Sequence, residues 1–182
     1  MPEFNLNEQE KHALLKLARD TISFELGGVE SEDPVATPAM QEHCGAFVTL
    51  NSAGALRGCI GHIESDRPLL ELVKKMASAA AFDDPRFTPL QEEDLALVEL
   101  EISVLSPLWE ASKWSDFEVG THGVLLSRGY RQAVFLPQVA PEQGWNTETT
   151  LTHLALKAGM NADEWRAEDC RFQLFTAVVF SE

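Results

Sequence analysis

One stretch, residues 45–63, decides the fold class of this 182-residue chain and reads GAFVTLNSAGALRGCIGHI. Its first part, 45–50, contains Phe, Val, Thr and Leu, which favour β-strands. The Asn-Ser-Ala-Gly run at 51–54 is typical of a turn, and 55–63 is expected to return as the second strand. Strands joined by so short a turn run antiparallel. The stretch therefore predicts a β-hairpin, which we place near the centre of the fold.

Helices are predicted on both sides of this hairpin. Residues 7–10 have the spacing of a capping box, and the helix that follows is expected to end at Gly27. After the hairpin, Asp66 is the expected N-cap of a second helix with Pro68 in its first turn, and Asp83 marks its end. The apolar stripe of this second helix consists of Leu69, Leu72, Val73, Met76 and Ala80.

Strands continue beyond the second helix without a regular alternation with helices. Residues 97–105 alternate between apolar and polar side chains, as a half-buried strand does. A second hairpin is predicted at 123–136, a helix at 147–158 and a last strand at 171–180. Strands arranged in hairpins favour an α+β fold, with a mostly antiparallel sheet and flanking helices, in one domain.

The charge of the chain bears on its partners. Lys and Arg number 14 against 29 Asp and Glu, which gives a formal net charge of −15. Such a charge repels nucleic-acid phosphates and anionic membranes, so we expect neither as a partner. The sequence has no apolar run long enough to span a membrane and no signal-peptide pattern at its start, which predicts a cytoplasmic location.

The three cysteines are widely spaced and odd in number, which argues against a disulfide framework. There is no CxxC or HxxxH pair and no glycine-rich nucleotide-binding motif. The sequence therefore predicts neither a metal nor a cofactor.

The residues most suited to chemistry lie in the returning strand of the hairpin. Arg57 and Cys59 are two residues apart, so regular alternation would put them on one face, roughly 7 Å apart. A guanidinium near a thiol favours the nucleophilic thiolate. Gly58 and Gly61 are then candidate substrate-binding positions, because glycine lets a ligand approach the backbone. The alternative is structural: Cys59 is a small buried hydrophobe, and the two glycines relieve crowding.

The segment Leu56–Gly61 resembles the signature of the AMMECR domain family, whose bacterial and archaeal members are called AmmeMemoRadiSam system protein A. Further segments resemble other blocks of the family in the same order, so that the similarity covers nearly the whole chain. They include Gly45–Leu50, Asp84–Phe87, Glu101–Leu105, Val119–Gly123 and Leu136–Ala140. The resemblance implies one AMMECR-type domain over residues 1–182, built as two lobes around a cleft that the signature faces.

On this picture three more residues become candidates. Glu101 is a general acid or base, or else the ion-pair partner of an arginine. Arg86 binds a carboxylate or phosphate through two parallel hydrogen bonds, or else ties down its own turn. His122 exchanges protons with Cys59, or else is an ordinary hydrogen-bonding residue. His62, where the family pattern leads us to expect a small hydroxyl residue, is a second proton carrier or simply faces solvent.

The resemblance brings a fold but no established activity, so two functions stay open. The first is an enzyme that uses Cys59 on a small molecule or modified residue, working with the Memo-family and radical SAM proteins that usually accompany the family. The second is a non-catalytic module that holds a ligand or protein for those companions. Nucleic-acid binding ranks last because of the charge. Cys44, beside His43, is expected to be the main rival of Cys59 in thiol reactivity.

Overall fold

The structure is a computed structural model that describes residues 4–182 and divides into two compact units. Unit 1 comprises the chain up to Leu105 together with Val178–Glu182, and unit 2 comprises Ser106–Ala177. Each unit has its own hydrophobic core and its own four-stranded sheet.

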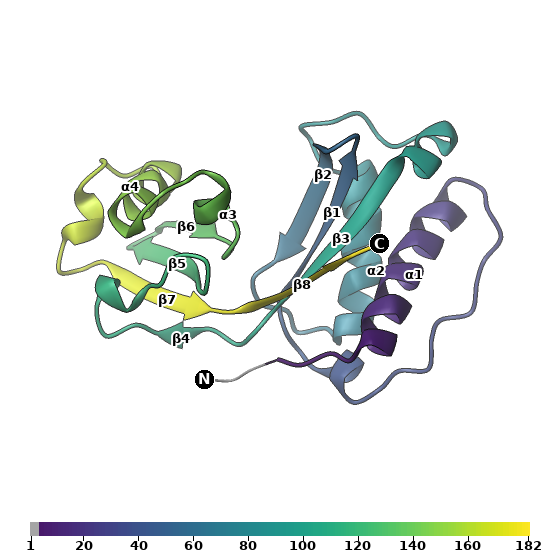
Figure 1. The fold of residues 1–182 in the computed structure, drawn as a ribbon, viewed down its shortest axis with the longest axis horizontal. Helices are drawn as coiled ribbons and strands as arrows, with labels where there is room; N and C mark the ends of the chain where they lie inside the picture. The colour runs from purple at the N-terminus through teal and green to yellow at the C-terminus, as the bar shows by residue number, and fades with distance from the viewer. Residues whose placement is uncertain (1–3) are drawn as a thin grey trace. The chain divides into compact units, whose positions relative to one another are not determined.

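Unit 1 is a sheet with two helices on one face (Figure 1). Its strands lie in the order β2-β1-β3-β8, with β1 antiparallel to both of its neighbours. The strands are β1 (Ala46–Ser52), β2 (Ala55–His62), β3 (Val98–Leu105) and β8 (Ala177–Ser181). The helices are α1 (Glu8–Glu25) and α2 (Leu69–Phe82). Alternate side chains of β1 and β3 are buried beneath them, as the apolar alternation predicts.

The two helices begin differently. The capping box predicted for α1 is confirmed: the Asn7 side chain accepts from the Glu10 N–H, and the Glu10 carboxylate accepts from the Asn7 N–H. For α2 the predicted cap is wrong. The N-cap is Pro68, and no side chain caps the helix. Asp66 lies two residues too early for the N-cap position, whose side chain bonds the first free N–H groups.

The predicted hairpin is confirmed as β1 and β2, joined through Ala53 and Gly54, both at positive φ. Such a pair of residues closes a two-residue hairpin with the twist of the flanking strands. The pairing is not regular, because the register shifts between Leu50 and Asn51. The hairpin is also less central than predicted, since β2 is an edge strand.

Unit 2 has a sheet of order β4-β7-β5-β6, with α4 packed on β6. The strands are β4 (Trp109–Glu110), β5 (Gly123–Arg128), β6 (Arg131–Phe135) and β7 (Arg171–Phe175). The helices are α3 (Val139–Glu142) and α4 (Thr147–Lys157). Short 3-10 turns complete both units at Ala39–Gln41, Glu92–Leu97, Trp114–Asp116 and Glu164–Arg166.

The single last strand predicted over 171–180 is wrong in one respect. It is two strands, β7 and β8, which belong to different sheets on either side of Thr176. The fold class is confirmed, because both units combine antiparallel pairing with flanking helices. Within residues 4–182 no helix is both long and apolar enough to cross a membrane.

Candidate active site around Cys59

A row of three side chains crosses the sheet of unit 1 on the face opposite its helices. Thr49 of β1 lies directly opposite Cys59 of β2 and also opposite Glu101 of β3. Residues paired in this way share a face of the sheet. The Thr49 hydroxyl donates a hydrogen bond to Cys59 Sγ at 3.3 Å. Thr49 therefore lies between Cys59 and Glu101. Cys59 and Glu101 are about two strand spacings, or ~10 Å, apart.

Arg57 lies at an irregularity in the pairing of β2 with β1. Gly58 lies opposite Leu50, whereas Leu56 already lies opposite Asn51, so Arg57 is the extra residue of a β-bulge. Its guanidinium forms an ion pair with Asp94, at 3.5 Å between Nη2 and Oδ2. The pairing is regular at Gly58 and Cys59, so the expectation that Arg57 shares a strand face with Cys59 stays a prediction.

The arginine that reaches Cys59 is Arg86. Its Nη2 donates to the carbonyl oxygen of Cys59 at 3.2 Å, and Asp84 Oδ2 accepts from the Cys59 N–H at 2.9 Å. Because β2 is an edge strand, this N–H and carbonyl have no strand on their outer side. Asp84 and Arg86 take the place of that strand and hold the backbone of Cys59 from both ends.

A tight turn after α2 brings Asp84 and Arg86 to this edge. The helix ends at Phe82, and the Phe87 N–H donates to the Asp84 carbonyl at 3.1 Å. Asp84 Oδ1 accepts from the Arg86 backbone N–H at 3.1 Å, which is the hydrogen bond of an Asx turn. The same oxygen accepts from Arg86 Nε at 2.9 Å, and Oδ2 accepts from Arg86 Nη2 at 2.7 Å. The parallel pair of bonds predicted for Arg86 therefore forms with Asp84 of its own turn.

These contacts determine the charge states of Asp84 and Arg86. The hydrogen bond from Arg86, aided by the N–H groups of Cys59 and Arg86, holds the pKa of Asp84 far below its usual range, although burial opposes this. Asp84 in turn raises the pKa of Arg86, and the nearby Cys59 adds a smaller contribution in the same direction. Both groups are therefore ionised at neutral pH, with the buried carboxylate fixed behind the more exposed guanidinium.

Packing accounts for both glycines of the segment. A Cβ on Gly58 would lie 2.2 Å from the carbonyl oxygen of Ala80 in α2. A Cβ on Gly61 would lie 2.3 Å from the ring of Phe47. Real Cβ atoms do not approach other atoms so closely, so glycine lets α2 and the Phe47 ring pack directly on β2. The substrate-binding role of Gly58 and Gly61 stays a prediction.

The other thiols lie in less reactive surroundings. Cys44 is buried in the core of unit 1, and burial raises its pKa to about 12. Desolvation also raises the pKa of Cys170 in unit 2, and its thiol donates to the carbonyl of Glu164 at 3.2 Å. Burial of Cys44 opposes the expectation that it rivals Cys59, because a buried thiol resists ionisation, and the order of their reactivities stays a prediction.

The two histidines named as proton carriers have different surroundings. His62 is exposed and lies opposite Ala46, on the face of the sheet away from Cys59. The solvent-facing interpretation is therefore the correct one. His122 is buried in unit 2, where Nδ1 accepts from the Glu118 N–H at 3.2 Å. Its Nε2 makes no hydrogen bond within the described chain. Proton exchange between His122 and Cys59 stays a prediction, since they belong to different units.

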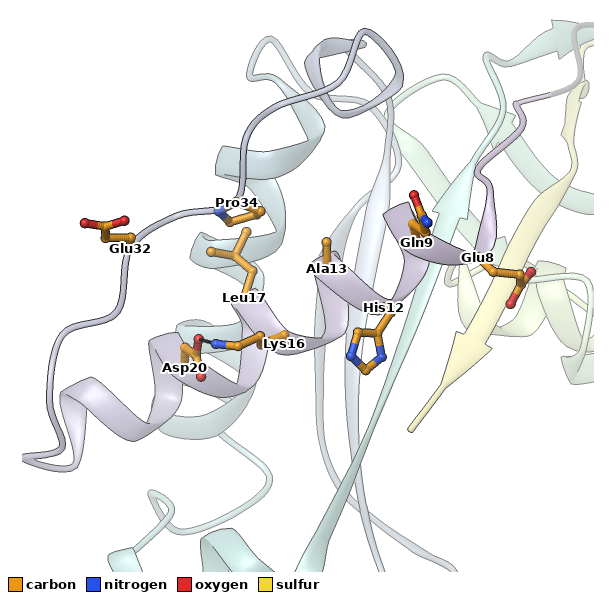
Figure 2. A pocket seen from close by; sticks show the side chains of 9 residues that line it. All are labelled: Glu8, Gln9, His12, Ala13, Lys16, Leu17, Asp20, Glu32 and Pro34. Carbon is orange, nitrogen blue, oxygen red and sulfur yellow. Dashed lines mark hydrogen bonds and ion pairs between the residues drawn. The ribbon is translucent and has the colours of Figure 1, made fainter.

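A pocket of about 540 Å³ lies elsewhere in unit 1, between α1 and the segment around Pro34. Figure 2 shows Leu17, Ala13 and His12 on the helix, with Pro34 on the segment that passes alongside. None of its lining residues belongs to the Cys59 row. Among residues 4–182 no three His, Cys, Asp or Glu side chains are grouped so as to hold a metal ion.

The site thus consists of a half-buried thiol, a hydroxyl that donates to it and an ion pair that holds its backbone. In this arrangement the thiol can act as a nucleophile, with charge that develops on sulfur stabilised by Thr49 and Arg86. Sequence reasoning missed Thr49 and Asp84 as members. The Asp84–Phe87 block could have identified Asp84, because Asp two residues before Arg is an Asx-turn pattern.

Comparison with known proteins gives one consistent result. The model of the family described as AMMECR1 matches residues 15–180. Protein MK0488 of Methanopyrus kandleri is 37% identical over 187 residues, which cover 97% of this chain and 90% of that protein. Protein PH0010 of Pyrococcus horikoshii is 38% identical over 191 residues, covering 98% and 93%. The crystal structure of this uncharacterized protein PH0010 superposes with a TM-score of 0.85, at 38% identity over 93% of this chain and 89% of the other.

Proposed function

The chain belongs to the AMMECR1 family, and from this premise we propose that it is a cytoplasmic enzyme that uses Cys59 as a nucleophile. Its substrate is a small molecule or a modified residue. The observation that supports this most is the hold on Cys59: Asp84 and Arg86 bind its backbone, and Thr49 donates to its sulfur. The bond from Thr49 involves the sulfur itself, whereas the two backbone bonds fix the position of residue 59.

Each neighbour has a distinct role in the proposed reaction. The Cys59 thiolate attacks an electrophilic carbon, and the leaving group departs with its bonding electrons. Arg86 offers positive charge beside the reacting sulfur, and Thr49 donates a hydrogen bond to it. Asp84 is a positioning residue, because it fixes the guanidinium and the Cys59 backbone through one buried carboxylate. Glu101, in the same row as Thr49, is the proposed proton acceptor.

The proteins that usually accompany the family suggest the process in which this activity is used. Memo-family and radical SAM proteins are the proposed partners, so the substrate is expected to be a precursor or product of radical chemistry, or a residue of a partner protein. The alternative is a non-catalytic module that holds a ligand for these proteins. The packing role of Gly58 and Gly61 does not distinguish the two functions, because both need a ligand near Cys59.

A capture experiment distinguishes the two functions. Wild-type protein, Cys59→Ala and the matched control Cys170→Ala are incubated with metabolite extract, and retained molecules and cysteine adducts are identified by mass spectrometry. The enzyme proposal predicts an adduct on Cys59, formed by the wild type and by Cys170→Ala but lost in Cys59→Ala. A ligand retained equally by all three proteins, with no adduct, would instead establish the binding module.

A further inference from the structure

The guanidinium of Arg86 has one terminal nitrogen to offer a ligand. Nε and Nη2 donate to Asp84, and Nη2 also donates to the Cys59 carbonyl. Nη1 makes no hydrogen bond to any of the residues that the structure describes. The Arg86 side chain is 53% exposed, so this nitrogen is accessible to a molecule that arrives from solvent.

Asp84 does not cancel the attraction of Arg86 for an anion, because the two charges differ in depth. The Asp84 side chain is only 2% exposed, and both of its oxygens already accept hydrogen bonds from Arg86 or Cys59. A ligand therefore meets the guanidinium first and the carboxylate behind it. The ion pair acts as a fixed dipole with its positive end outward, and its geometry is set before the ligand binds.

The position of Arg86 relates this anion site to the thiol. Its Nη2 bonds the carbonyl oxygen of Cys59, the residue whose Sγ is the proposed nucleophile. An anion on the neighbouring Nη1 therefore lies beside the residue that carries the thiol, at the outer edge of β2. Glu101, a like charge, lies further into the sheet beyond Thr49, away from the outer edge where Arg86 binds. An anionic group of a ligand is thus accommodated at the outer edge of β2, while the reacting carbon of the same ligand lies over the Cys59 thiol.

We infer that the Cys59 site takes a small carboxylate that also carries an electrophilic carbon, with Arg86 as the carboxylate-binding residue. This inference rests on the proposed role of Cys59. A carboxylate fits better than a phosphate because one free donor nitrogen suits a monoanion, and the net charge of −15 opposes a dianion. In the reaction a sulfur–carbon bond forms, the leaving group takes its bonding electrons, and the thiol proton goes to Glu101, the proposed proton acceptor.

Two alkylating reagents test this directly. Iodoacetate and iodoacetamide have the same electrophilic carbon and the same leaving group, iodide, and differ in carrying a carboxylate or an amide. Their rate constants are measured at Cys59 in the full-length protein by mass spectrometry, with glutathione and Cys170 as references. The iodoacetate-to-iodoacetamide ratio at Cys59 is expected to exceed that of glutathione roughly tenfold, because a nearby guanidinium attracts the carboxylate. Acetate should compete with iodoacetate and spare iodoacetamide.

Variants assign the effect to Arg86. Arg86→Gln should return the ratio to that of glutathione, and Arg86→Lys should keep part of the preference. Because Arg86→Gln removes the partner of Asp84, its folding is checked by circular dichroism, and the acetate competition in wild type gives an answer independent of that variant. Rapid alkylation by iodoacetamide with a glutathione-like ratio would overturn the carboxylate inference alone. Alkylation of Cys59 no faster than Cys170 by either reagent would overturn the proposed function as well.

Discussion

Replacement of Asp84 by Asn should destabilise unit 1 strongly for a change of one atom. The carboxylate accepts from the backbone N–H groups of Cys59 and Arg86 and from Nε and Nη2 of Arg86. Two donors converge on each oxygen, so an amide in either orientation places its NH₂ against two other donors. It also leaves the guanidinium of Arg86 without its counterion. The neighbouring Asp83→Asn is the matched control, because that side chain is exposed.

The free energy of unfolding of Asp84→Asn is expected to be about 2–3 kcal/mol lower than that of the wild type at pH 7. A hydrogen bond to a charged group contributes about 1.5–3 kcal/mol, and the amide loses two such bonds. Water reaches the half-exposed guanidinium and recovers part of this loss. The pKa of Asp84 lies far below its usual range, so the carboxylate contributes its stabilisation above the unfolded value near 4. The difference between wild type and Asp84→Asn should therefore be constant from pH 5 to 8 and shrink as pH falls below about 4.

The assay must separate the two units. All four tryptophans, at 109, 114, 145 and 165, lie in unit 2, whereas α1 and α2 supply most of the helix. Urea unfolding is therefore followed by tryptophan fluorescence for unit 2 and by far-UV circular dichroism for unit 1. Asp84→Asn should lower the midpoint of the dichroism transition. If it costs no more than Asp83→Asn, or if the cost is unchanged at pH 3, the role assigned to the Asp84 carboxylate is wrong.

Further changes give separate tests. Gly58→Ala should cost about 1–3 kcal/mol, because its Cβ would lie 2.2 Å from the Ala80 carbonyl oxygen; a loss below 0.5 kcal/mol by urea unfolding would refute this contact. Thr49→Val should slow alkylation of Cys59 severalfold with little loss of stability, and an unchanged rate would show that the hydroxyl does not assist the sulfur. Cys44 should be labelled only when unit 1 unfolds, since burial raises its pKa to about 12; labelling of the native protein would contradict its position in the core. Retention on heparin at physiological salt should be negligible at a net charge of −15, and tight, salt-sensitive retention would reverse the exclusion of nucleic acid.

The sequence predicts local elements well where a single pattern determines them. The capping box at Asn7, the alternation of residues 98–104 and the hairpin at 45–63 depend on neighbours in the chain, and the structure has all three. It does not predict the division of the last strand between two sheets. Residues 171–180 have one continuous strand pattern, and the partner of each half is chosen by packing far away in the sequence.

The site was predicted in part for the same reason. Cys59 was identified from its own segment, and Arg57 was named as its neighbour there, but the ion pair of Arg57 with Asp94 depends on a residue far along the chain. Arg86 was named as a ligand-binding residue, and its contact with Cys59 depends on a turn 27 residues further along the chain. Asp84 was noted only as the first residue of the Asp84–Phe87 block, with no role at the site. Its role becomes evident once the edge of β2 is known to need partners.

Site-resolved pulse alkylation tests the central claim most directly. Native protein is exposed briefly to iodoacetamide at several pH values, and the rate at each of the three cysteines is read by mass spectrometry. The account predicts that Cys59 reacts fastest, and that Arg86→Gln slows Cys59 while leaving Cys170 unchanged. If Cys59 reacts no faster than Cys170 and Arg86→Gln has no effect, Cys59 is not an activated nucleophile, and the enzyme proposal is contradicted.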